Sequence, residues 1–88
     1  MEEIIKPISR AKIKEELSKD KFLRPTRKGG NEIYSVNIHD SPNTLMEIGR
    51  LRELTFRNSG GGTGLKMDLD DFDTSENCYQ QLIVWSPN

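Results

Sequence analysis

The sequence has few of the residues that build covalent or metal-linked scaffolds. Its 88 residues include one cysteine, Cys78, and one histidine, His39. A single cysteine excludes an internal disulfide framework, and it cannot form a zinc site on its own. As a nucleophile Cys78 would need an activating base, and nothing in the sequence brings His39 near it. We therefore predict no bound metal, and we interpret Cys78 as a small, half-buried residue.

Long hydrophobic runs and internal repeats are also absent. No stretch of about 18 apolar residues occurs, so no transmembrane helix is predicted. The first seven residues are acidic and have no long apolar core, which argues against a secretory signal. We expect a cytoplasmic protein, with a peripheral place at the inner membrane face as the alternative. The length suits one small domain with a modest core.

The formal net charge of −1 hides two segments of opposite sign. Residues 19–28 hold five basic residues and one acid, whereas residues 68–76 hold five acids and no base. The basic segment suits an acidic partner or the surface of an anionic membrane. The alternatives are that each segment is simply solvated or that the two segments contact each other. We predict no nucleic-acid binding, because only Phe22 accompanies the basic residues and the acidic segment would repel phosphate.

Hydrophobic periodicity predicts two helices and two strands. A short helix is expected at 11–17, with Ser9 as its candidate N-cap. Strands are expected at 32–38 and at 79–85. The longer helix is the clearest element, because apolar residues follow a helical period at Leu45, Ile48, Leu51 and Leu54.

The boundaries of the longer helix and the connections around it follow from turn and cap residues. Thr44 and Glu47 have the form of a capping box, although Ser41 before Pro42 is an alternative start. Asn58-Ser59-Gly60 is expected to supply a left-handed cap at its end. Two stretches are expected to be loops, residues 20–30 and the long glycine-rich and acidic stretch 60–77.

Three stretches resemble nucleotide or metal motifs but have the wrong context. Residues 57–62 fit an Arg-x-x-Gly-x-Gly pyrophosphate loop, yet such a loop precedes a helix and this one follows a helix. Residues 60–66 lack the Gly-Lys step and the preceding strand of a P-loop. Residues 68–79 begin like an EF-hand but place Asp73 where glycine is needed, and Tyr79 where glutamate is needed. We predict no cofactor, with opportunistic calcium or magnesium binding as the alternative.

Arg52 and Phe56 lie four residues apart on the longer helix. An arginine at the border of an apolar stripe needs a carboxylate partner. The acidic segment offers three candidates: Asp68, Asp70 and Asp73. We predict that they converge on Arg52, with Arg50 as a competing partner, and hold the long loop over the helix. Fully exposed surface charges are the alternative.

These residues resemble two groups of proteins with GNAT-like folds. Acyl-homoserine-lactone (autoinducer) synthases carry an arginine and a phenylalanine at the spacing of Arg52 and Phe56, followed by an acidic segment like residues 68–73. The closer resemblance is to the bacterial N-acyltransferases that make ornithine and glycine lipids, often labelled hemolysins. The stretches that carry it are 48–57, 61–64, 67–73 and 79–85.

The resemblance implies an α+β fold that is the N-terminal portion of a GNAT-like fold, with antiparallel strands. Residues 1–30 would form an N-terminal helix and basic loop, and residues 31–88 an incomplete acyltransferase domain. The implied activity is transfer of a fatty acyl group from acyl carrier protein to an amino-acid amine. Residues implied on the substrate side, or in a structural network there, are Arg52, Phe56, Asp68, Asp70 and Asp73.

We expect no acyltransferase activity from these 88 residues alone. In the family that they resemble, the acyl donor is bound by a later strand and helix, and no residue here is assigned as the catalytic base. The alternative is a small protein-interaction or oligomerisation module, in which the acidic loop or an unpaired sheet edge contacts another protein or forms a homodimer.

Overall fold

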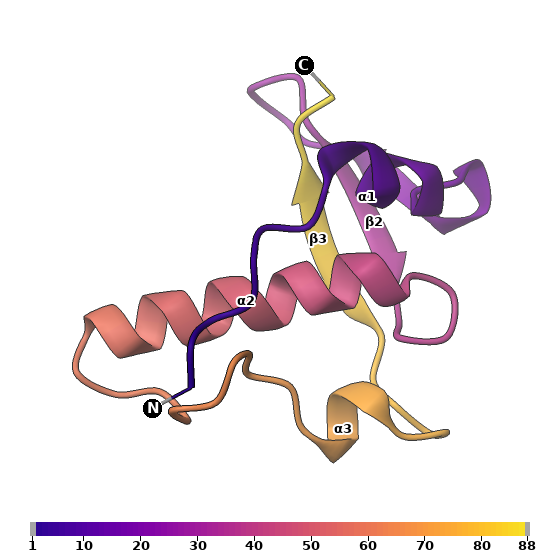
Figure 1. Cartoon of the computed structure of the whole chain (residues 1–88). Coiled ribbons are helices and arrows are strands. Elements are labelled where there is room, and N and C mark those ends of the chain that lie inside the picture. Colours follow the sequence, from indigo (N-terminus) through magenta and orange to yellow (C-terminus); the bar gives the residue numbers. More distant parts are fainter. Residues whose placement is uncertain (1, 88) are drawn as a thin grey trace.

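A computed structural model of the chain describes residues 2–87. Its three strands form one antiparallel sheet in the order β1-β2-β3, and helix α2 crosses one face of that sheet (Figure 1). The predicted α+β class, with antiparallel strands, is therefore confirmed. In chain order the elements are α1 (Arg10–Glu16), the 3-10 turn η1 (Lys19–Lys21), β1 (Phe22–Pro25), β2 (Glu32–Val36), α2 (Pro42–Asn58), α3 (Asp71–Thr74) and β3 (Gln81–Trp85).

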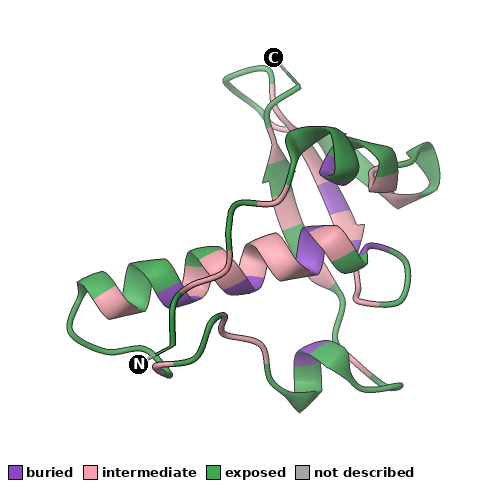
Figure 2. Ribbon diagram, viewed as in Figure 1, coloured by how far each residue is buried: buried purple, intermediate pink, exposed green. Residues whose placement is uncertain are grey.

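The core lies between α2 and the facing side of β2 and β3. Tyr34, Val36 and Leu45 are buried at its centre, and Figure 2 shows buried positions on both β2 and α2. Strand alternation brings Tyr34 and Val36 to one face, as predicted. Ile83, the β3 partner of Tyr34, packs against the same cluster. The core is small, as expected for this length.

Helix α2 begins differently from the capping box predicted at Thr44 and Glu47. Pro42 is its first residue and Ser41 its N-cap position, which was the alternative start. The Ser41 side chain makes no cap hydrogen bond. Instead, the carboxylate of Glu16 accepts hydrogen bonds from the backbone nitrogens of residues 43 and 44. A carboxylate from α1 thus satisfies the free amides at this helix start.

The predicted apolar stripe of α2 is only partly buried. Leu45 is inaccessible, but Leu51 and Leu54 are 46% and 38% exposed. The buried positions after Leu45 are Gly49 and Glu53, one turn apart. The face of α2 that packs inward is therefore rotated away from the face that hydrophobicity predicted. Gly60, with φ of 87°, adopts the left-handed conformation expected just after the helix.

Strand β1 lies where the sequence predicted a basic loop between residues 20 and 30. It pairs antiparallel with β2, with an irregularity between Phe22 and Arg24. The Phe22 ring packs edge-on against Tyr34 with centroids 5.6 Å apart. A short, basic strand with a proline is a common form of sheet edge, which is why its pattern resembles a loop.

Helix α3 is a single turn inside the predicted 60–77 loop. The side chain of Asp70 accepts hydrogen bonds from the backbone nitrogens of Phe72 and Asp73. In turn, the side chain of Asp73 accepts a hydrogen bond from the backbone nitrogen of Asp70. This reciprocal pattern is a capping box built from two aspartates. A turn this short has no hydrophobic period for sequence analysis to detect.

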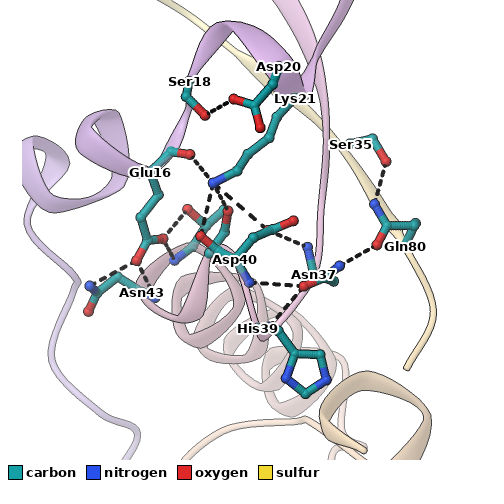
Figure 3. A network of polar contacts seen from close by, with 12 residues as sticks. Glu16, Ser18, Asp20, Lys21, Ser35, Asn37, His39, Asp40, Asn43 and Gln80 are labelled. Atoms are coloured by element: carbon teal, nitrogen blue, oxygen red, sulfur yellow. Dashed lines mark hydrogen bonds and ion pairs between the residues drawn. The ribbon is translucent and has the colours of Figure 1, made fainter. Parts of the chain in front are cut away.

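Polar contacts fix the connection between β2 and α2 (Figure 3). The Lys21 ammonium donates to the carbonyl oxygens of Glu16 and Asp40, at 2.5 and 2.9 Å, and to the Ser41 hydroxyl at 3.1 Å. Asn37 accepts hydrogen bonds from the backbone nitrogens of residues 39 and 40. One lysine of the basic segment therefore has a structural role rather than an exposed one.

Candidate functional site

Arg52 joins three elements at one end of the acidic segment. Its Nη1 lies 3.0 Å from Oδ2 of Asp73, and its Nη2 donates to Oε1 of Gln81 at 3.3 Å. The Gln81 amide closes the triangle by donating to Oδ1 of Asp73 at 2.7 Å. Helix α2, helix α3 and strand β3 are thereby connected through side chains.

Burial differs sharply between the two charged partners. The Asp73 side chain is 7% exposed and that of Arg52 is 33% exposed. The side chain of Asp73 also accepts a hydrogen bond from the backbone nitrogen of Asp70, as part of the α3 cap. The carboxylate oxygens of Asp73 thus accept hydrogen bonds from Arg52, Asp70 and Gln81. The side chain of Arg52, by contrast, remains partly exposed to solvent. Arginine has five N–H donors, so Arg52 can hold Asp73 and still bind a further acceptor.

The hydrogen bonds and the ion pair of Arg52 involve Asp73 and Gln81, not the other residues predicted for this network. Asp70 caps α3, and Asp68 reaches α2 only through its backbone nitrogen, which donates to the Gly49 carbonyl at 2.9 Å. Arg50 pairs with Glu47 at 2.6 Å and does not compete for the aspartates. Phe56 is half exposed, one turn beyond Arg52. Of the three aspartates, the structure brings only Asp73 to the guanidinium.

A close backbone approach holds the acidic segment against α2. At Gly49 an added Cβ would lie 2.8 Å from Cγ of Leu69, which is nearer than real Cβ contacts come. Leu69 packs against the core from this position. Glycine therefore allows the segment to lie directly on the helix, just before the residues that cap α3.

Glu53 is a site residue that the sequence analysis missed. Its side chain is fully buried on α2. It accepts hydrogen bonds from the Thr63 hydroxyl at 2.7 Å, the Thr63 nitrogen at 2.9 Å and the Gly64 nitrogen at 3.1 Å. The Thr63 hydroxyl contributes most to lowering the pKa of Glu53 to about 2, and burial opposes that shift. The sequence pattern that could have indicated an ion pair here is Glu53 and Arg57, four residues apart on a helix and followed by a glycine-rich stretch.

Arg57 extends this buried cluster to the start of the chain. It pairs with Glu53 at 2.9 Å and donates to the carbonyl oxygens of Glu2 and Leu65 at 2.8 and 2.7 Å. Two backbone hydrogen bonds also join residues 2 and 5 to residues 64 and 66. The glycine-rich loop thus directs the amides of Thr63 and Gly64 at a protein carboxylate.

An apolar cleft of about 310 Å³ opens between α1, α2 and β3. Its apolar lining includes Ile8, Ile13, Ile48, Leu51, Ile83 and Trp85. The Arg10 guanidinium lies over the Trp85 ring, 4.1 Å from its centroid. A shallower hollow on α2 shares Ile48 and Leu51 and continues past Arg52 to Phe56. Apolar surface therefore runs from Trp85 to the guanidinium of Arg52.

Two kinds of feature are absent among residues 2–87, a cluster of metal-ligating side chains and a helix of membrane-spanning length. Across residues 2–87, no three histidine, cysteine or acidic side chains gather as a metal site would require. No helix in the same range has the length and apolar character to cross a membrane. Cys78 is half-buried, as predicted. The Ser75 carbonyl oxygen lies 3.0 Å from Nε2 of His39 and accepts the backbone nitrogen of Cys78 at 3.1 Å, so the structure brings His39 near Cys78, which the sequence did not indicate.

Comparison with known proteins shows that the chain is similar to N-acyltransferases, which confirms the predicted resemblance to that group. In particular, the chain is 60% identical over 87 residues to a glycine N(alpha)-acyltransferase of Phocaeicola vulgatus. It is 56% identical over 87 residues to a protein of the same name from Bacteroides thetaiotaomicron.

The matched region is nearly the whole chain but a small part of each relative. Both alignments cover 99% of this chain, and they cover 27% and 26% of the two relatives. The chain therefore spans about a quarter of the length of the curated relatives that it matches. No protein-family model matches it, and no solved structure matches it.

Proposed function

We propose that the chain is the N-terminal portion of a GNAT-like enzyme that transfers a fatty acyl group from acyl carrier protein to the amine of glycine. The observation that carries this proposal is 60% identity over 87 residues to a protein named as a glycine N(alpha)-acyltransferase. In such a transfer the amine nitrogen attacks the thioester carbonyl. A C–N bond forms, the C–S bond breaks, and the carrier thiol leaves with the proton that the amine releases.

In this proposal Arg52 is a binding residue on the substrate side. Its partly exposed guanidinium borders the apolar surface between Leu51 and Phe56. A guanidinium in that setting suits a carboxylate such as that of glycine, because it offers planar paired donors. Asp73 and Gln81 act as positioning residues that hold the guanidinium in place. We assign no catalytic base among residues 2–87.

A chimera provides the test. This chain would replace the matching quarter of the Phocaeicola vulgatus relative, and N-acylglycine would be measured with acyl carrier protein thioester and glycine. We expect product from the chimera and none from the 88 residues alone. A folded but inactive chimera, beside an active parent relative, would contradict the proposal.

Two arginine variants of the chimera separate binding from general surface charge. Arg52→Lys keeps the charge but loses the paired donors, so we expect a rise in KM for glycine of about tenfold or more. Arg50→Lys is the matched control, because Arg50 pairs with Glu47 on the same helix and has no substrate role in this proposal. If the two variants raised KM for glycine equally, the proposal that Arg52 binds the substrate would be wrong.

The basic hairpin between β1 and β2 is our proposed contact for the acyl carrier protein. Arg24, Arg27 and Lys28 are exposed there. Clustered basic side chains favour association with an acidic protein, and salt weakens that attraction. Raising the ionic strength should therefore raise KM for the carrier protein more than KM for glycine. A requirement for anionic vesicles instead would favour the membrane surface as the partner of this hairpin.

A further inference from the structure

The position of helix α2 that faces Leu69 is occupied by Gly49. A Cβ atom added to Gly49 would lie 2.8, 3.2 and 3.3 Å from Cγ, Cδ2 and Cδ1 of Leu69. All three nearest atoms therefore belong to the branched end of one side chain. Rotating the two methyl groups of Leu69 about its Cβ–Cγ bond would leave Cγ in place, so this rotation cannot relieve the shortest contact.

Leu69 is held in this position from two sides. It packs against the buried core cluster, so turning its side chain away from Gly49 would take it out of the core. The backbone beside it is anchored as well, because the Asp68 nitrogen donates to the Gly49 carbonyl oxygen at 2.9 Å. Gly49→Ala therefore has to move the segment outward. Ordinary van der Waals contacts begin at 3.4 Å, so the shift is at least about 0.6 Å, the difference between 3.4 and 2.8 Å.

A short path joins this contact to Arg52. The segment that leads into α3 runs along α2 (Figure 1), and Asp70 caps α3 directly after residue 69. The side chain of Asp73 accepts the backbone N–H of Asp70 at 3.1 Å and lies 3.0 Å from Nη1 of Arg52. Gly49 and Arg52 are three residues apart on α2, so the segment contacts the helix at two points about one turn apart. Its distance from α2 at Gly49 thus sets the distance of Asp73 from Arg52.

The pair between Arg52 and Asp73 has little room for such a shift. Adding about 0.6 Å to their separation of 3.0 Å gives about 3.6 Å. That separation is too long for a hydrogen bond. Either the hydrogen bond is lost, or the guanidinium follows Asp73 and leaves its place beside the apolar surface. Both outcomes change the direction in which the remaining N–H donors of Arg52 point.

We infer that Gly49 is a positioning residue for glycine binding, because its direct contact with Leu69 fixes Asp73 and, through Asp73, the guanidinium of Arg52. This inference rests on the proposed function, in which the carboxylate of glycine binds Arg52. It assigns an effect on substrate affinity to a helix position whose side chain is a single hydrogen atom and which does not contact the substrate.

Steady-state kinetics of the full-length chimera provide the first test. We expect Gly49→Ala to raise KM for glycine about tenfold and to leave kcat nearly unchanged, because the carboxylate contact is made equally in the bound substrate and in the transition state. Glu16→Ala is the control for lost stability, since it removes the cap at Thr44, eight residues before Arg52. It should leave KM unchanged. Equal rises in KM in the two variants would overturn the inference.

Leu69→Ala provides a rescue that a general loss of stability would not give. In the double variant, Gly49→Ala with Leu69→Ala, the added methyl group has room. We expect KM for glycine to return to within about twofold of that of the Leu69→Ala variant. The double variant should nevertheless remain less stable than the unsubstituted chimera, because the core contacts of Leu69 are lost. A KM that stays about tenfold higher in the double variant would overturn the inference.

Nuclear magnetic resonance of the 88-residue chain tests the positioning of Arg52 without catalysis. We expect the Nη protons of Arg52 to exchange with water faster in Gly49→Ala than in the unsubstituted chain, and to regain their protection in the double variant. The guanidinium of Arg50, which pairs with Glu47, is the internal reference and should not change. Unchanged exchange of the Arg52 protons in a folded Gly49→Ala chain would overturn the inference.

The two readouts separate this inference from the proposed function. Faster exchange at Arg52 in Gly49→Ala, beside an inactive chimera, would support the positioning of Arg52 by Gly49 and count against the acyltransferase activity. An active chimera whose KM for glycine is the same with and without Gly49→Ala would support the activity and overturn the inference.

Discussion

Glu16 on helix α1 caps helix α2 at Thr44. One carboxylate oxygen of Glu16 lies 2.8 Å from both the backbone nitrogen and the hydroxyl oxygen of Thr44, and the other accepts two hydrogen bonds from Asn43. Burial is the largest single effect on the pKa of Glu16 and would raise it, but the four hydrogen bonds from Asn43 and Thr44 together outweigh burial and lower it. The cap comes from a residue 28 positions away along the chain, so it also fixes the packing of α1 on α2.

Removing this cap should destabilise the fold. We expect Glu16→Ala to lower the free energy of unfolding by about 1–2 kcal/mol, the usual effect of losing an N-terminal cap. Glu15→Ala is the matched control, because Glu15 is exposed on the same helix, and it should change stability by less than about 0.5 kcal/mol. Urea unfolding of both variants measures the difference. Equal losses would show that Glu16 does not act as a cap.

Acid should weaken the fold through Glu53. The pKa of this residue is lowered from its usual value of 4.5 to about 2. A depressed pKa contributes stability that is complete above the unfolded value and is lost as pH falls through the folded value. We therefore expect the thermal midpoint to fall between pH 4.5 and pH 2. The lowered pKa values of Glu16 and Glu47 act in the same direction.

Glu53→Gln separates the contribution of Glu53 from that of the other carboxylates. The variant should be less stable at pH 7, because the amide cannot accept all the hydrogen bonds from Thr63, Gly64 and Arg57. It should also show a shallower fall below pH 4.5, since the substituted group does not titrate. A fall as steep as that of the original chain would assign the acid sensitivity to other groups.

The ion pair between Asp73 and Arg52 should keep the acidic segment folded against α2. Asp73→Ala removes the partner of Arg52, of the Gln81 amide and of the α3 cap, so we expect a loss of about 1–3 kcal/mol. Limited proteolysis should then cleave residues 60–80 faster. Asp71→Ala, at an exposed position on the same helix, is the control and should leave the cleavage rate nearly unchanged. Unaltered cleavage of the Asp73 variant would show that another contact anchors the segment.

A methyl group at Gly49 should push the acidic segment off α2. Alanine favours a helix over glycine by up to about 1 kcal/mol, but overpacking against Leu69 costs about 1–3 kcal/mol. We therefore expect Gly49→Ala to destabilise the fold on balance. Combining it with Leu69→Ala should remove most of the added cost, and a double-mutant cycle in urea measures that coupling. Purely additive effects would contradict the close contact.

Sequence periodicity predicted the helices and strands in which apolar residues recur with a regular spacing. Val36 and Leu45 occupy the buried positions expected of them. The single turn of α3 was missed because its stability comes from two aspartates that cap each other, which leaves no hydrophobic trace. Strand β1 was missed because its residues suit an exposed edge. Local pattern alone does not report either kind of stabilisation.

The candidate site was predictable only in part for a related reason. Arg52 and the acidic segment suggested a pairing, but selecting Asp73 over its neighbours required the path of the chain after Gly49. Glu53 resembles an ordinary charged residue of a solvated helix face. Its burial depends on Thr63 and Gly64, which fold back over it from the following loop.

The backbone bonds between residues 2–5 and residues 64–66 set an order for folding during synthesis. The first residues leave the ribosome well before Gly64 exists, and translation adds about 5–20 residues each second. Until then residues 2–5 lack the backbone partners that they have in the folded chain. Likewise, Glu16 can cap α2 only after Asn43 and Thr44 have been made. Residues 2–5 are thus made long before the residues that hold them in place.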